Sequence, residues 1–425
     1  MMNYQQAWAY LDNLQFFKIK LGLDSMNDFL GRVGNPQERL RCIHIAGTNG
    51  KGSVAMNLLT LLTGAGYKVG LYTSPHLSSV RERFRINNSY ISEDDFAAGA
   101  SRIAGVLGDR QITYFEFTTA MALLWFAEQQ VDLAILEVGM GGRLDATNVV
   151  RPEVAVITNV SMDHEAYLGT TLAQVASEKA GIIKAGVPVV SGVADDASRQ
   201  VVEQRCAEYG VELRLLGRDF YHEGAVDGSW TYHGTEQTIS ALRCGMRGAY
   251  QRDNSSLALA VCEYLSAKGW PLSHEVIRSR LKQVSWPGRL EHFTHQGHHF
   301  LLDGAHNPAG MQSLCAGLAK EFSYRRLVCV WAAMADKDIA TSLATISPYC
   351  DVLIFTRPES ERSATAAQLR DGLGPFSGTV CEEPGVEQAL TRARALATDD
   401  DLILVAGSLY LVGAARCYLL GELVG

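Results

Sequence analysis

Short apolar runs alternate with helical patterns over the first 190 residues of the chain. The runs begin at Cys42 and cover 69–72, 133–136, 154–157 and 187–191. The run at 133–136 is wholly apolar, as in a strand buried on both faces of a parallel sheet. Helical patterns lie between the runs, at 92–106, 118–130 and 172–180. This alternation predicts a doubly wound, mostly parallel sheet of the α/β class.

The remaining segments predict a helical start, an antiparallel excursion and a domain boundary. Residues 1–40 have a mainly helical pattern, whereas 211–245 are rich in Gly, Thr, Tyr and Trp with little helical period. Helical patterns return at 254–267 and 274–283. The Ser-Trp-Pro-Gly segment at 285–288 is the expected boundary, because Pro and Gly interrupt regular structure.

After this boundary the βα alternation starts again, with strands expected at 300–303, 327–331, 352–356 and 402–406. A chain of 425 residues is too long for one ordinary hydrophobic core. We therefore expect a first domain over 1–285, followed by a smaller, Rossmann-like α/β domain over 286–425.

Composition and charge exclude several classes of function. Hydrophobic residues make up 47% of the chain, which is typical of a globular protein, and a net charge of −8 without a basic block argues against general nucleic-acid binding. The nine cysteines include no C-x-x-C pair, so we expect reduced thiols and a cytoplasmic protein. The first residues lack an apolar signal core, and glycines interrupt the longest apolar tract, 402–415. We expect no membrane association.

The first predicted strand leads into a glycine-rich turn and then a helical pattern. The turn consists of Thr48, Asn49, Gly50, Lys51, Gly52 and Ser53. Strand, loop and helix in this order are typical of a phosphate-binding loop (P-loop), where main-chain N–H groups and the helix N-terminus bind phosphate oxygens. We expect Lys51 to reach the β- and γ-phosphates of a nucleotide. The alternative is an ordinary glycine-rich turn.

This loop differs from the common G-x-x-x-x-G-K-[ST] pattern in two ways. Gly47 and Gly50 are closer together, and Gly52 follows Lys51 where a Ser or Thr normally binds magnesium. If the loop binds Mg-ATP, another residue must supply that ligand.

Three polar residues lie at or just after the ends of other predicted strands: Ser74, Glu137 and His164. Ligands of parallel sheets bind at the carboxyl ends of strands, so we expect these residues near Gly47. Glu137 would be satisfied by a divalent metal, Ser74 is a candidate for the missing hydroxyl, and His164 is a candidate for metal or phosphate binding. The alternatives are an exposed strand end, a turn serine and a structural histidine.

Other polar residues are harder to interpret from pattern alone. Lys179 lies in a helical stretch, where a solvent-exposed lysine is the simplest interpretation. The four histidines between 292 and 299 lack partners at zinc-site spacing, so we assign them to the surface or a hairpin. Asp303 and His306 flank a predicted strand end in the second domain, where they would face a crevice at the carboxyl edge of the sheet.

Together these motifs make the chain resemble the Mur-ligase-type ATP-dependent amide ligases. Within that family it is similar to the folylpolyglutamate synthases, above all the bacterial bifunctional dihydrofolate synthase/folylpolyglutamate synthases. The segments that carry the resemblance follow the order of the family, at 46–53, 73–77, 113–116, 136–148, 163–164, 178–184, 286–289, 303–308, 336–338 and 407–410.

The resemblance implies roles that pattern alone does not give. Thr48, Asn49, Gly50, Lys51, Gly52 and Ser53 would bind the nucleotide, together with Asn254, Arg289 and Asp303. Ser74, Glu137 and His164 match magnesium ligands, which answers the question left by Gly52. Lys179 matches a lysine that becomes carbamylated and then helps to hold a second Mg²⁺. Lys51, Lys179 and His306 would be the catalytic residues. A monovalent cation is a further candidate cofactor.

The resemblance also implies a pterin pocket. Its residues would be Ile19, Lys20 and Leu21 from an early loop, Thr113, Tyr114, Phe115 and Glu116, and Leu144, Asp145 and Ala146. The implied substrates are dihydropteroate, folates and L-glutamate, handled by a monomeric enzyme. A substrate carboxylate would attack the γ-phosphate of ATP, and the amine of L-glutamate would then displace phosphate from the acyl phosphate.

Three alternatives remain at this stage. A monofunctional folylpolyglutamate synthase would not use dihydropteroate. A Mur-type ligase of cell-wall precursors would keep the loop and the lysine but not the segments at 113–116 and 144–146. A regulatory module that only binds ATP would leave Glu137, His164 and Lys179 unexplained as a set.

Overall fold

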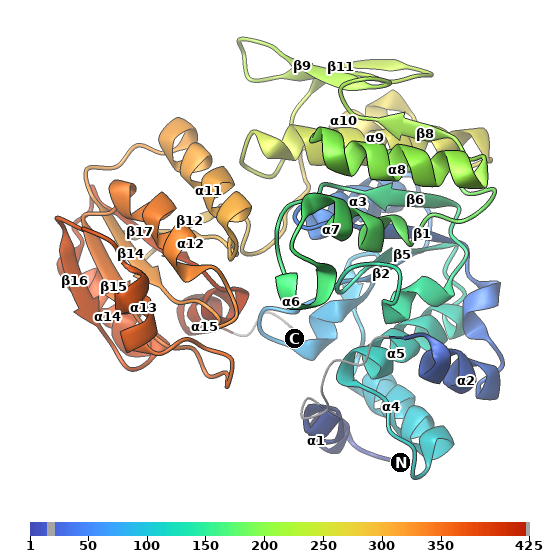
Figure 1. Ribbon diagram of the computed structural model, residues 1–425, viewed down its shortest axis with the longest axis horizontal. Helices are drawn as coiled ribbons and strands as arrows, with labels where there is room; N and C mark the ends of the chain where they lie inside the picture. Colours follow the sequence, from blue (N-terminus) through green and yellow to red (C-terminus); the bar gives the residue numbers. More distant parts are fainter. Residues whose placement is uncertain (15–21, 422–425) are drawn as a thin grey trace. The chain divides into compact units, whose positions relative to one another are not determined.

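The protein is described by a computed structural model that covers residues 1–14 and 22–421. Its chain forms two compact units (Figure 1). The first unit consists of Met1–Pro75, Val80–Gly245 and Arg252–Val284. The second unit contains His76–Ser79, Met246–Gln251 and the described residues from Ser285 onward. Two short pieces that precede the predicted boundary at 285–288 therefore belong to the second unit, and nothing in the apolar pattern indicates this.

The first unit is built on an eight-stranded sheet with the strand order β4-β3-β2-β5-β1-β6-β7-β8. The strands from β2 to β8 in this order are parallel, and β3 and β4 add an antiparallel edge. The strand bounds are β1 Cys42–Ala46, β2 Val69–Tyr72, β3 Phe84–Ile86, β4 Ser89–Tyr90, β5 Leu133–Glu137, β6 Val154–Ile157, β7 Val189–Ser191 and β8 Leu213–Leu215.

Helices cover this sheet and bury its apolar runs. Every residue of β1, β2, β5 and β6 is buried, which explains their near-continuous apolar sequence. One hydrophobic cluster joins α1, α2, α4 and α5 to β2 and β5, and another joins α7 and α8 to β6 and β7. The helices of this unit are α1 Tyr4–Asn13, α2 Asp24–Arg32, α3 Lys51–Gly64, α4 Glu93–Leu107, α5 Tyr114–Glu128, α6 Glu165–Leu168, α7 Leu172–Ala180, α8 Asp196–Tyr209, α10 His274–Leu281 and most of α9 Tyr250–Ala267.

The predicted doubly wound, mostly parallel sheet is confirmed, with local differences. Helix α5 begins at Tyr114, four residues before the predicted start, because Thr113 and Glu116 form a capping box. The segment 211–245 is only partly an antiparallel excursion. Its first strand, β8, joins the main sheet in parallel, and β9 Tyr221–Gly224, β10 Trp230–His233 and β11 Thr238–Leu242 form the antiparallel sheet.

The second unit is a smaller α/β fold, as predicted. Its six strands have the order β12-β13-β17-β14-β15-β16 and run parallel from β13 to β16, while β12 pairs with β13 as a hairpin. The element bounds are β12 Glu291–His295, β13 His298–Leu302, α11 Pro308–Glu321, β14 Leu327–Trp331, α12 Ile339–Ile346, β15 Val352–Phe355, α13 Ala366–Gly372, β16 Thr379–Glu382, α14 Val386–Leu396, β17 Leu402–Ala406 and α15 Leu409–Leu420.

The structure also bears on the histidine cluster at 292–299 and on membrane-spanning helices. The four histidines between 292 and 299 lie in the β12–β13 hairpin, as predicted. Among residues 1–14 and 22–421, every helix is too short or too polar to span a bilayer.

Candidate active site

The glycine-rich turn connects β1 to α3, and two of its glycines have left-handed backbone angles. A Cβ atom on Gly47 would lie 1.8 Å from Thr158 Oγ1, and one on Gly50 would lie 2.6 Å from Asn254 Oδ1. With φ values of 153° and 83°, neither position accepts an ordinary side chain without strain. Helix α3 begins at Lys51, so its N-terminus and the turn together offer the main-chain donors that a phosphate group requires.

The segment after β6 braces this turn. Thr158 Oγ1 donates to the carbonyl of Asn49 over 2.6 Å, and the Asn159 side chain bonds to both the N–H and the carbonyl of Asn49. Thr48 exchanges hydrogen bonds of 3.0 Å with the main chain of Ser161. No role is expected for Thr158, Asn159 or Ser161 from the sequence. Their position after a strand adjacent to β1 was the available signal.

Lys51 lies over the turn from which it starts. Its Nζ donates to the carbonyl oxygens of Gly47 and Thr48, at 3.1 and 3.2 Å. The ammonium group is therefore held above the loop, at the helix N-terminus where phosphates bind.

The strand ends predicted to gather do lie on neighbouring strands. In the sheet, β2, β5, β1 and β6 are consecutive. Glu137 ends β5 and His164 follows β6, the two strands that flank β1, whereas Ser74 follows β2, which lies on the far side of β5. The main-chain N–H of Ser74 donates to Glu137 Oε2 over 3.2 Å. Glu137 is 5% exposed, so its interpretation as an exposed strand end is wrong. His164 has a left-handed backbone with φ 53° and occupies the N-cap position of α6, where its side chain makes no capping hydrogen bond.

Lys179 is buried and lies close to charged groups of this region. Only 3% of the residue is exposed, so the interpretation as a solvent-exposed lysine is wrong. Burial and the nearby charge of Lys51 lower the pKa of Lys179 from 10.5 to about 7, and the carboxylates of Asp163 and Asp145 oppose this shift. A lysine with this pKa is partly neutral near pH 7, which is required of an amine that reacts as a nucleophile.

A glycine-rich loop covers the helix that carries Lys179. A Cβ atom on Gly142 would lie 2.8 Å from the carbonyl oxygen of Glu178, and the Arg143 guanidinium forms a 2.7 Å ion pair with the Glu178 carboxylate. The Asn148 side chain donates to the carbonyls of Arg143 and Gly181. These contacts hold the loop against the C-terminal half of α7, on which Lys179 and Ala180 are buried.

The predicted pterin-pocket residues lie in two neighbouring segments of the first unit. Thr113 caps α5, with Glu116 closing the capping box, and Ser25 Oγ donates to the Glu116 carboxylate. The Phe115 ring packs so closely on Gly139 that a Cβ atom there would lie 2.5 Å from it. Tyr114 and Leu144 are half-buried, while Asp145 and Ala146 are buried. Ile19, Lys20 and Leu21 fall outside the described residues.

Asn254 belongs to the first unit, like the phosphate loop, whereas the predicted nucleotide residues Arg289 and Asp303 belong to the second. Asp303 is buried at the end of β13 and accepts hydrogen bonds from the N–H groups of Leu290 and Ala305, each at 2.9 Å. Burial raises its pKa above the ordinary value, while the charge of Arg289 and those N–H groups oppose the shift. His306 is half-buried, with Nδ1 2.8 Å from the carbonyl oxygen of Gly304.

The donor set fits a metal that is bound together with a nucleotide. Within the described residues, no group of three or more His, Cys, Asp and Glu side chains is arranged as a metal cage. Mg²⁺ does not need such a cage, since it takes one or two carboxylates together with phosphate oxygens and water. A buried carboxylate beside a serine and near the phosphate loop meets that requirement.

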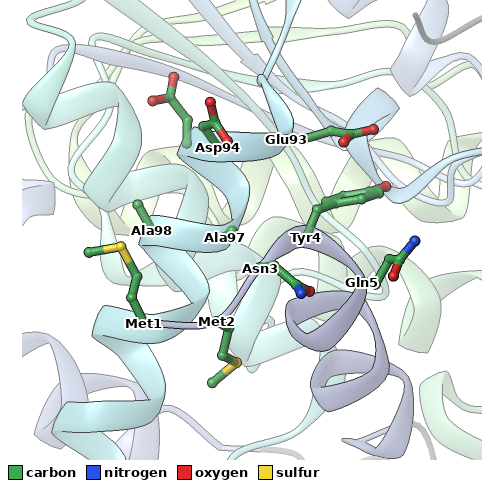
Figure 2. A pocket seen from close by; sticks show the side chains of 10 residues that line it. Met1, Met2, Asn3, Tyr4, Gln5, Glu93, Asp94, Ala97 and Ala98 are labelled. Carbon is green, nitrogen blue, oxygen red and sulfur yellow. The ribbon is translucent and has the colours of Figure 1, made fainter.

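An open cavity in the first unit lies elsewhere. It is lined by the start of the chain and the first turn of α4, including Met1, Tyr4, Glu93 and Asp94 (Figure 2). None of the predicted site residues lines it.

Comparison with known proteins identifies the family that this chain resembles. The model of the Mur ligase middle domain matches residues 45–262, and that of the Mur ligase glutamate ligase domain matches residues 288–409. The dihydrofolate synthase/folylpolyglutamate synthase of Bacillus subtilis is 32% identical, over 97% of this chain and 98% of the relative.

Two solved structures have the same fold along nearly their whole length. One is E. coli FolC in complex with DHPP and ADP, with a TM-score of 0.89, 33% identity and coverage of 98% of this chain and 97% of the other. The other is a bifunctional folylpolyglutamate synthase/dihydrofolate synthase with Mn, AMPPNP and L-glutamate bound. Its TM-score is 0.88 at 33% identity, over 97% of this chain and 98% of the other.

Proposed function

The chain belongs to the Mur ligase family, and within that family we propose that it is a bifunctional dihydrofolate synthase/folylpolyglutamate synthase. It is an ATP-dependent carboxylate–amine ligase. It joins L-glutamate to dihydropteroate, and joins further L-glutamate to folates. Of the two solved structures compared above, one holds DHPP and ADP and the other holds Mn, AMPPNP and L-glutamate, which supports ATP, a divalent metal and these substrate classes here.

One observation carries the proposal: the phosphate loop, the Ser74–Glu137 pair and the buried Lys179 occur in one unit, around consecutive strands of one sheet. A protein that only binds ATP has no need of a second, buried lysine whose charge interacts with that of Lys51. A ligase has that need, because an anionic carboxylate must approach an anionic phosphate, and a buried lysine that is converted into an anion can help to hold a second Mg²⁺ that supplies positive charge there.

The site residues are assigned as follows. Thr48, Asn49, Gly50, Lys51, Gly52, Ser53 and Asn254 bind the nucleotide in the first unit, and Arg289 and Asp303 do so in the second. Thr113, Tyr114, Phe115, Glu116, Leu144, Asp145 and Ala146 form the pterin pocket, to which Ile19, Lys20 and Leu21 also contribute. His306 acts near the reacting centre.

In the first chemical step, a carboxylate oxygen of the pterin substrate attacks the γ-phosphorus of ATP, and ADP leaves. Lys51 neutralises charge on the phosphates in this step, while main-chain N–H groups of the loop orient them. The amine of L-glutamate then attacks the acyl carbon, the amide forms, and phosphate leaves with the former carboxylate oxygen. A proton is lost from the attacking amine.

A divalent metal, when bound, would be held by Ser74, Glu137 and His164 and would supply positive charge to the phosphates. We assign a carbamate to Lys179. The neutral amine adds to CO₂ and loses a proton, which converts a cationic side chain into an anion able to help hold a second Mg²⁺. A monovalent cation is a further cofactor in this proposal.

We further assign residues 1–285 to the ATP-binding domain with the pterin pocket and residues 286–425 to the C-terminal ligase domain. We propose a monomer in the cytoplasm. All nine cysteines are unpaired thiols, which suits a reducing compartment.

The deciding experiment is a product assay that offers dihydropteroate and tetrahydrofolate separately, each with ATP, Mg²⁺ and L-glutamate. The proposal predicts a glutamylated product from both. Activity with tetrahydrofolate alone would identify a monofunctional folylpolyglutamate synthase. ATP hydrolysis without either product would contradict the ligase assignment.

A further inference from the structure

His44 is a buried polar residue of β1 to which none of the proposed roles applies. Its side chain is fully buried in the strand that leads into the phosphate loop. His44 Nε2 lies 2.8 Å from Thr147 Oγ1, and the Thr147 hydroxyl donates to Asp145 Oδ1. Because the hydroxyl hydrogen is directed at Asp145, the hydroxyl oxygen must accept from His44, which therefore carries its proton on Nε2.

The histidine acts as a neutral donor of fixed direction. Burial and the charge of Lys184 lower the pKa of His44 to about 3, so its ring stays uncharged at neutral pH. Its other nitrogen, Nδ1, has no hydrogen-bond partner within the described residues. The single bond to Thr147 is therefore the polar contact that fixes the ring.

The Asp145 carboxylate that accepts from Thr147 also closes the turn at 139–145. Its Oδ1 accepts from the N–H and hydroxyl of Thr147, and its Oδ2 accepts from the N–H groups of Gly139 and Met140, at 3.0 and 2.9 Å. These two amides follow Glu137 by two and three residues. The carboxylate thus holds the chain between Gly139 and Asp145 in a closed loop.

This closed loop forms a surface on which an aromatic ring lies. A Cβ atom on Gly139 would stand 2.5 Å from the Phe115 ring, so the ring packs directly on the turn that Asp145 holds. Phe115 and Asp145 both belong to the proposed pterin pocket. A change in the direction of the Asp145 carboxylate would therefore move one wall of that pocket.

We propose that His44 and Thr147 are positioning residues for the pterin pocket, which orient Asp145 and through it fix the turn at 139–145 against Phe115. This inference rests on the proposed function, because it is the proposed pterin site that the turn shapes. It links the interior of β1, directly before the phosphate loop, to the pocket for the second substrate.

Thr147→Val tests the proposal, because it keeps the shape of the side chain and removes its hydroxyl. We expect KM for dihydropteroate and for tetrahydrofolate to rise about tenfold, as for the loss of a hydrogen bond to a charged group, with KM for ATP unchanged. Thr147→Ser retains a hydroxyl, so its KM values for both pterin substrates should stay close to those of the wild type. Thr158→Val is the matched variant, since its buried hydroxyl bonds to Asn49 in the phosphate loop, and it should raise KM for ATP instead.

His44 provides a second pair of variants. His44→Leu removes the donor and should raise the same two KM values by less than Thr147→Val, because Thr147 still bonds to Asp145. His44→Gln offers an amide donor in place of Nε2 and should remain close to the wild type.

A measurement independent of activity separates this proposal from the proposed function. Hydrogen–deuterium exchange should show faster exchange of the Gly139 and Met140 amides in Thr147→Val than in Thr147→Ser. If exchange is faster but the protein does not use pterin substrates, the proposed function is wrong, and so is the role of His44 and Thr147 in the pterin pocket. Their role in holding the turn at 139–145 would still be supported. Unchanged exchange, or an equal rise of KM for ATP and pterin substrates, would overturn the inference.

Discussion

The main-chain N–H of Ser74 donates a hydrogen bond of 3.2 Å to the Glu137 carboxylate and so ties together the ends of the adjacent strands β2 and β5. Glu137 is nearly inaccessible to solvent, and a buried carboxylate needs donors or a cation. Strand β1 lies on the other side of β5 and leads into the loop that carries Lys51. A serine hydroxyl and a carboxylate are therefore available beside a phosphate loop whose usual hydroxyl position is occupied by Gly52.

Ser74 is expected to supply the hydroxyl ligand of the metal. Ser74→Ala should raise the Mg²⁺ concentration needed for half-maximal activity by about tenfold, on the scale of the loss of one contact to a charged partner. A structure with Mg²⁺ and an ATP analogue should place Ser74 Oγ about 2.1 Å from the ion. Ser53→Ala is the matched variant. A larger shift for Ser53→Ala than for Ser74→Ala would contradict this assignment.

Lys51 is expected to be indispensable for turnover. Lys51→Ala should lower kcat by about 10²–10³-fold, the range seen when one preorganised electrostatic contact is removed. Unfolding temperature should change little, because Nζ donates to two carbonyls of the half-buried loop from which the helix starts. The exposed Lys282 provides the control variant Lys282→Ala. A folded Lys51→Ala enzyme with near-normal turnover would exclude the phosphate role.

Several strands of both units could be predicted from the sequence to the residue. The runs at 69–72, 327–331 and 402–406 coincide with β2, β14 and β17, because each is a fully buried apolar segment between polar turns. Helix α8 was missed, since its buried face is formed by Ser198, Val202 and Cys206, a weak apolar pattern. The pieces 76–79 and 246–251 belong to the second unit through tertiary contacts that no local pattern encodes.

The environment of Lys179 is the clearest case in which local sequence was insufficient. Val175, Ala176 and Ala180 are buried on α7, and Lys179 follows Val175 by four residues on the same helical face. That spacing was a signal of burial. The nearby charge of Lys51 could not be foreseen, because it arises only when α7 packs near the start of α3.

A carbamate is expected on Lys179, because a partly neutral amine can react with CO₂ and a bare ammonium beside Mg²⁺ would repel the ion. Native mass spectrometry should detect an added mass of about 44 Da. Lys179→Ala should lose activity and regain part of it with added short-chain carboxylates, which can occupy the vacated anion site. Lys282→Ala should show neither effect. Full activity of Lys179→Ala without additives would show that neither Lys179 nor a carbamate on it is needed for catalysis.

The lowered pKa of Lys179 also predicts a pH dependence of stability in protein freed of CO₂ and metal. Between pH 7 and 10.5 the unfolded lysine holds its proton while the folded one has largely lost it, so the unfolded state binds more protons and stability rises with pH. Lys179→Met cannot titrate. The free energy of unfolding of the wild type, minus that of Lys179→Met, should therefore increase from pH 7 to pH 10. A constant difference would show that Lys179 titrates alike in both states.

Ligation through an acyl phosphate transfers an oxygen atom from the substrate carboxylate to phosphate, and an isotope label can follow that atom. Dihydropteroate labelled with ¹⁸O in its carboxylate is incubated with the enzyme, ATP, Mg²⁺ and L-glutamate, and the released phosphate is analysed by mass spectrometry. We expect one ¹⁸O atom in the phosphate for each amide formed, because the attacking carboxylate oxygen leaves with phosphorus. Amide formation with unlabelled phosphate would contradict it.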